Sequence, residues 1–147
     1  MEQPKPFLTP PPDDPRIGYS VTRRADGGMN YVFTAADHET LVHWREFAAR
    51  HLETADHHTR NRYDLRALTS ISEEALKFAL EAASDPAARN VRTAIVVASP
   101  AIGAALEEVG LISESGDLRV FHSIEDAEHW LTQPFSRLLK AQDVLAA

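Results

Sequence analysis

Hydrophobic and polar positions along the chain switch between two periods, one typical of strands and one typical of helices. Two strand-like runs, residues 17–24 and 29–34, flank an Ala-Asp-Gly-Gly turn and predict a β-hairpin. A helix is then expected from Asp37 to about Thr54, because Asp37 can cap it and apolar residues follow at helical spacing. This apolar face consists of Leu41, Trp44, Phe47, Ala48 and Leu52.

The rest of the chain continues the alternation of strands and helices. Strands are predicted at residues 62–65, 93–98 and 118–121. Helices are predicted at residues 72–84, from 99 to 110, and from 123 to about 131. The first of these is expected to turn Ala75, Leu76, Ala79, Leu80 and Ala83 inward. Residues 93–98 are almost uninterruptedly apolar, which predicts a strand covered on both faces.

This order of elements predicts an α/β fold with one domain at residues 16–133. The expected core is a mainly parallel, mixed five-stranded sheet with an N-terminal β-hairpin and helices packed on it. Residues 1–15 hold six of the nine prolines and predict a flexible tail. Residues 134–147 predict a C-terminal amphipathic helix that covers its own domain or forms a homodimer. Its apolar stripe consists of Phe135, Leu138, Leu139 and Leu145.

The composition of the chain excludes several classes of function. A net charge of −7 argues against nucleic-acid binding, which needs a basic face. The absence of cysteine excludes disulfides, thiolate nucleophiles and cysteine-based metal sites. No pair of the seven histidines has the spacing of three or four residues that one helical face requires, so no metal site is expected. No apolar run is long enough for a membrane span, and a cytoplasmic location is expected.

The predicted strand ends offer the three residue types of a hydrolase triad, Asp64, Ser99 and His122. Ser99 lacks the flanking glycines of a nucleophile elbow, however, and helix capping alone explains Ser99-Pro100. The six glycines form neither a dinucleotide fingerprint nor a phosphate-binding loop. The sequence therefore predicts a non-catalytic protein without a cofactor. A hydrolase ranks third, after the two binding functions described below.

Three segments carry a similarity to a known family. They are Tyr-Asp-Leu-Arg at residues 63–66 running into Thr-Ser-Ile-Ser at 69–72, the strand at 95–99, and the strand and helix at 120–131. Together they resemble the STAS superfamily, and within it the SpoIIAA-like bacterial proteins, over roughly residues 17 to 133. That group is also compared with the lipid-binding Sec14 (CRAL-TRIO) fold.

The resemblance also contains a departure. Antagonists of this family carry a pattern like Asp-Ser-Ser-Gly, in which a partner kinase phosphorylates a serine. The aligned residues here are Ser72-Glu73-Glu74-Ala75, so glutamate stands at the acceptor position. That glutamate either mimics a fixed negative charge or simply suits the first turn of a helix. Phosphorylation by the family's route is not expected, although Ser70 and Ser72 lie nearby.

These observations predict a non-catalytic regulatory or binding module of the STAS/SpoIIAA-like type. It would bind a protein partner or a small anion at the loop 69–74, where backbone N–H groups open a helix. The candidate site residues are Asp64, Thr69, Ser70, Ser72, Glu73, Ser99 and His122. The alternative, implied by the Sec14 comparison, is a carrier or sensor of a small apolar ligand or lipid. That alternative requires a cavity between the sheet and the helices.

Overall fold

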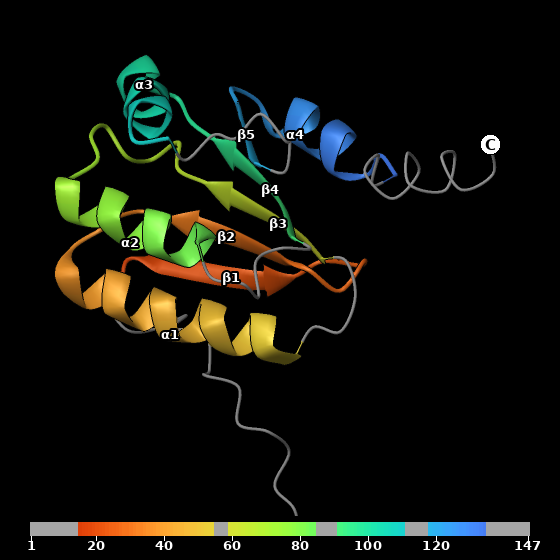
Figure 1. Ribbon diagram of the computed structural model, residues 1–147, viewed down its shortest axis with the longest axis horizontal. Coiled ribbons are helices and arrows are strands. Elements are labelled where there is room, and N and C mark those ends of the chain that lie inside the picture. The colour runs from red at the N-terminus through yellow and green to blue at the C-terminus, as the bar shows by residue number, and fades with distance from the viewer. Residues whose placement is uncertain (1–14, 55–58, 85–90, 111–117, 135–147) are drawn as a thin grey trace, which may run out of the picture.

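The computed structural model describes residues 15–54, 59–84, 91–110 and 118–134 of the 147-residue chain. The predicted proline-rich tail, apart from Pro15, and the stripe of the predicted C-terminal helix lie outside these residues. Strands and helices alternate along the described chain (Figure 1). The strands are β1 (Tyr19–Arg23), β2 (Met29–Phe33), β3 (Thr59–Asp64), β4 (Val91–Val96) and β5 (Leu118–Phe121). The helices are α1 (His38–Thr54), α2 (Glu73–Ala83), α3 (Pro100–Glu108) and α4 (Ile124–Leu131).

The five strands form one mixed sheet in the order β1-β2-β3-β4-β5. The β1–β2 pair is antiparallel and the other three pairs are parallel, which confirms the predicted fold class. The hairpin turn needs its two glycines for different reasons. Gly27 has a φ of +94°, and a Cβ at Gly28 would lie 1.6 Å from the carbonyl oxygen of Arg60. Only glycine therefore allows β2 to approach β3 this closely.

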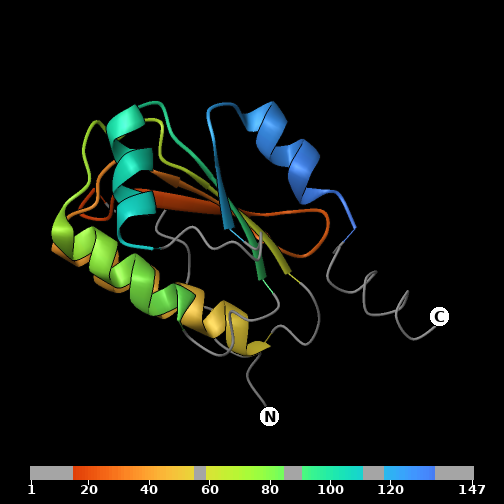
Figure 2. The ribbon, with the colours of Figure 1, turned by 45° about the horizontal axis from the view of Figure 1, so that its top comes forward.

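The connections divide the helices between the two faces of the sheet. Parallel strands that follow one another in sequence order are joined by right-handed crossovers, which place α1, α2 and α3 on the same face. The helix α4 follows the last strand and folds back over the opposite face (Figure 2). In both views α1 and α2 run side by side.

Aromatic residues fill the first face between α1 and the hairpin. The Tyr31 and Tyr63 rings stack with their centroids 4.4 Å apart, and Tyr19 stacks on Phe33 at 5.2 Å. The rings of Trp44 and Phe33 pack edge to face with their centroids 6.2 Å apart, so Trp44 lies on the inward face of α1, as predicted. Asp37 caps the helix by accepting a hydrogen bond from the Thr40 N–H at 2.9 Å. These aromatic contacts hold α1 against the hairpin and β3.

The opposite face of the sheet carries a small apolar cluster and several arginine side chains. Ala94 and Val96 of β4 are fully buried against Ala127 and Leu131 of α4. Around them, arginine side chains bind the C-terminal carbonyl oxygens of α4. Arg60 donates to the Leu131 oxygen at 2.6 Å, and Arg92 donates to the oxygens of Trp130 and Gln133 at 3.1 and 2.7 Å. Positive charge at this helix end complements the helix dipole.

The structure corrects three details of the predicted elements. The strand β3 begins at Thr59 rather than at residue 62. Its inward residues Thr59 and Asn61 are buried but polar, so the hydrophobic pattern does not indicate them. The strand β4 spans residues 91–96 rather than 93–98. Leu80 of α2 is 39% exposed rather than inward, since its helix meets the sheet through alanines.

Candidate functional site

Three predicted site residues follow the carboxyl ends of neighbouring parallel strands, at one edge of the sheet. Asp64 ends β3, Ser99 precedes α3, and His122 follows β5. The Asp64 carboxylate accepts hydrogen bonds from Arg66 Nε and Nη2 at 2.9 and 2.8 Å. The hydrogen bonds from Arg66 outweigh burial and lower the pKa of Asp64, which is therefore an ionised, internally paired carboxylate.

These residues do not form a catalytic triad in the structure. Among the described residues, no hydrogen bond joins Asp64, Ser99 and His122 to one another. Ser99 occupies the cap position of α3 without a capping hydrogen bond from its side chain, and His122 is exposed. A triad needs a base within hydrogen-bond reach of the nucleophile.

The predicted loop 69–74 presents its polar side chains to solvent. Thr69, Ser70 and Glu73 are exposed. Ser72 caps α2, its Oγ accepting from the Ala75 N–H at 3.1 Å. Glu73 and Glu74 place two carboxylates in the first turn, where they suit the helix dipole and repel a second anion. The geometry therefore gives no support to anion binding at this point.

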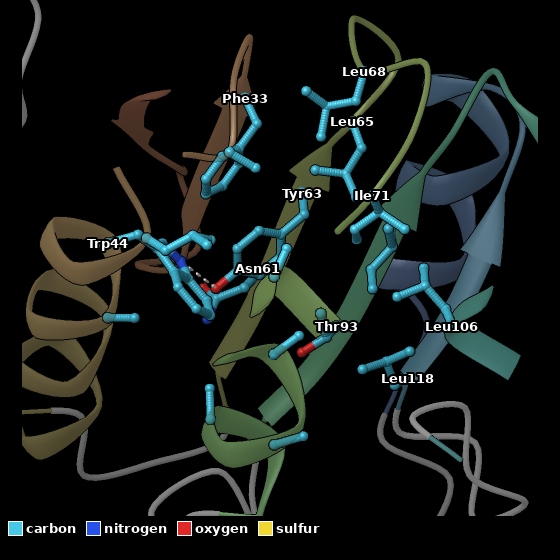
Figure 3. Close-up of a pocket in the computed structure, with 18 of the residues that line it drawn as sticks. Phe33, Trp44, Asn61, Tyr63, Leu65, Leu68, Ile71, Thr93, Leu106 and Leu118 are labelled. Atoms are coloured by element: carbon cyan, nitrogen blue, oxygen red, sulfur yellow. Dashed lines mark hydrogen bonds between the residues drawn. The ribbon is translucent and has the colours of Figure 1, made fainter. Parts of the chain in front are cut away.

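A cavity, termed the central cavity here, lies between the sheet and its three covering helices (Figure 3). Its volume is about 130 Å³. The α1 side contributes Leu41, Trp44 and Ala48, and the strands contribute Phe33, Asn61, Tyr63, Val91, Thr93, Ile95 and Leu118. Helix α2 contributes Ala75, Ala79, Ala82 and Ala83, and α3 contributes Leu106. None of the residues that line it is charged.

The alanines of α2 explain why this space exists. On either side, large residues such as Trp44 of α1 and Leu106 of α3 fill the distance between helix and sheet. Between them, α2 faces β3 and β4 with alanine at each of its four cavity positions. Protein interiors are normally close-packed, with few voids larger than a water molecule. Because alanine side chains are short, a space remains between α2 and the centre of the sheet.

The β3–α2 loop closes the end of the cavity near the carboxyl ends of the strands. Leu65, Leu68 and Ile71 point into it (Figure 3). The loop is predicted as a site because its backbone N–H groups open a helix, and that prediction does not include these apolar residues. Their spacing of three residues through a polar segment is the signal that could have revealed an inward-facing loop.

A tryptophan and a tyrosine join two walls of the cavity. The indole N–H of Trp44 donates to the hydroxyl oxygen of Tyr63 at 3.2 Å. Burial raises the pKa of Tyr63 well above its ordinary value, so its hydroxyl stays protonated at all physiological pH. The cavity therefore carries neutral polar groups on an otherwise apolar wall.

Other kinds of site find no support in the part of the chain that the structure describes. Its His, Asp and Glu side chains form no group of three or more that could hold a metal ion. None of the described helices combines the length and the apolarity needed to cross a membrane. No protein-family model matches the chain, and no match is found among curated proteins. The similarity to the STAS superfamily therefore remains a prediction from sequence.

Proposed function

We propose that the domain is a non-catalytic binding protein that holds a small apolar ligand in the central cavity. The observation that carries this proposal is the apolar space of about 130 Å³ beneath the alanine face of α2. An engineered apolar cavity of about 150 Å³ stays dry and binds benzene, so this volume suits a ligand built on one ring or a short branched chain. Of the functions expected from sequence, this is the alternative that required a cavity.

The energetic cost of the cavity supports the same proposal. Side chains that face this space lack packing partners on one side, so the space lowers the free energy of unfolding relative to a close-packed core. Domains of this size are stable by about 5–15 kcal/mol in total. A leucine-sized side chain in place of one inward alanine of α2 could remove much of that cost. A ligand removes it as well, because it restores contacts to the cavity wall.

The β3–α2 loop connects this proposal to the regulatory function expected from sequence. Leu68 and Ile71 line the cavity, whereas Thr69 and Ser70, between them in the chain, are exposed. An occupant that contacts the first pair restrains the backbone that presents the second. The loop 69–74 would thus report the state of the cavity to a protein partner, which makes the domain a sensor as well as a carrier.

Thermal unfolding in the presence of ethylbenzene tests the proposal. A ligand that binds only the folded state and is present at a concentration of ten times its dissociation constant stabilises that state by about 1.4 kcal/mol. For a domain of this size that corresponds to a rise in Tm of about 4 °C. Ala79→Leu should fill the cavity, raise the Tm without ligand and abolish the response to ethylbenzene.

The matched control is Ala104→Leu, which adds the same atoms at an exposed position of α3. This variant should keep the full response to ethylbenzene. If the wild-type Tm does not respond, or if Ala79→Leu responds as strongly as Ala104→Leu, the ligand does not occupy the central cavity and the proposal is wrong.

A further inference from the structure

The wall of the central cavity carries a pair of polar side chains on adjacent strands. Asn61 of β3 and Thr93 of β4 are register partners, and both line the cavity (Figure 3). Asn61 is only 4% exposed. Because they share one side of the sheet and are directly opposed in a parallel ladder, their side chains are close neighbours.

Only part of the hydrogen-bonding capacity of this pair is used within the domain. The Asn61 Oδ1 accepts from the Met29 N–H at 2.9 Å, which fixes the orientation of the amide. Neither the Nδ2 group of Asn61 nor the hydroxyl of Thr93 makes a hydrogen bond with the described residues. An amide donor and a neighbouring hydroxyl that both line an apolar cavity indicate a place for a ligand atom.

We infer that the ligand of the central cavity is a neutral molecule with a small apolar body and one oxygen acceptor, which Asn61 Nδ2 and the Thr93 hydroxyl bind together. This inference rests on the proposed function. A carbonyl oxygen has two lone pairs and can accept from both donors at once. A charged ligand is excluded because no charged residue lines the cavity to offset the loss of hydration. The ligand class is therefore a small ketone with a ring or a short branched chain.

The geometry of the cavity also orients the ligand. Asn61 and Thr93 lie on the strands, whereas Leu68 and Ile71 approach from the β3–α2 loop. With its oxygen at the polar pair, a ligand places its apolar body against the alanines of α2.

Two probes of the same shape test the inference by calorimetric titration of the full chain. Acetophenone carries the carbonyl oxygen, and α-methylstyrene has a CH₂ group in its place. Thr93→Val keeps the volume of the side chain and removes the hydroxyl. We expect this variant to lose roughly fivefold in affinity for acetophenone, the value of one ordinary hydrogen bond. Its affinity for α-methylstyrene should be unchanged or higher.

Thr93→Ser keeps the hydroxyl and should bind both probes in the wild-type ratio of affinities. If Thr93→Val changes the two affinities by the same factor, the polar pair does not contact the oxygen and the inference is wrong, while apolar binding in the cavity stands. If wild-type protein binds neither probe, the proposed function fails, and the inference fails with it.

Discussion

At the scale of single residues, Glu128 joins the covering helix α4 to the hairpin and the sheet. Its carboxylate accepts hydrogen bonds from Arg24 at 2.6 and 3.1 Å and from Arg62 at 2.6 Å. The side chain of Arg24 is only 6% exposed, and its positive charge is compensated by this partner and by Asp26. Charge-assisted, bidentate contacts of this kind are the stronger class of hydrogen bond.

The charge of Glu128 should make the stability of the domain depend on pH. Burial alone would raise its pKa, but the hydrogen bonds and charges of Arg24 and Arg62 outweigh burial and lower the pKa. A carboxylate with a lowered pKa in the folded state stabilises the fold above its unfolded pKa. That contribution is lost as the pH falls through the folded-state pKa.

We therefore expect Glu128→Gln to lower the free energy of unfolding at pH 7 by about 1–2 kcal/mol. The difference from wild type should shrink as the pH falls below about 4. Urea unfolding from pH 7 to pH 3 measures both effects. Glu46→Gln, on an exposed position of α1, is the control and should change stability by less than about 0.5 kcal/mol. A loss that is equal at all pH values would show that the charge of Glu128 is not what stabilises the domain.

At the scale of elements, the sequence predicts best those segments whose chemistry is local. The helices α2 and α4 are capped by Ser72 and Ser123, as expected, and each serine Oγ accepts a hydrogen bond from a backbone N–H of the first turn. The start of β3 was missed because Thr59 and Asn61 are polar residues that face the core. Their burial depends on neighbouring strands that no local pattern reveals.

The candidate site was predicted only in part, for a related reason. The edge of the sheet that carries Asp64, Ser99 and His122 followed from the order of strands and helices. The cavity did not, since the inward alanines of α2 are equally compatible with a tightly packed helix. Only the distance between α2 and the sheet, which depends on α1 and α3, decides whether alanine leaves a space.

The strand β4 provides a test of the element arrangement. Val96 is fully buried and lies in the apolar cluster beneath α4, whereas Ala98, two residues later, is exposed. Val96→Asp should abolish soluble expression, because an unpaired buried charge costs several kcal/mol. Ala98→Asp should express as wild type and unfold at a similar temperature. A soluble Val96→Asp protein with the Tm of wild type would contradict the position of β4 against α4.

At the scale of the whole molecule, the two faces of the sheet are packed in different ways. The face under α4 is sealed by an apolar cluster and by arginines that bind carboxylate and carbonyl oxygens. The face under α1, α2 and α3 carries the aromatic cluster on its hairpin side and the central cavity beneath α2. We interpret the first face as the structural support of the domain and the second as its binding face.

The most direct test of this account is an NMR titration of isotope-labelled protein with ethylbenzene. Binding in the central cavity predicts saturable chemical-shift changes at the methyl groups of Leu68, Ile71 and Leu106, which line it. The indole N–H of Trp44 should shift with the same dissociation constant, whereas that of Trp130, on the α4 face, should not move. Changes that do not saturate, or that are largest around Trp130, would contradict the account.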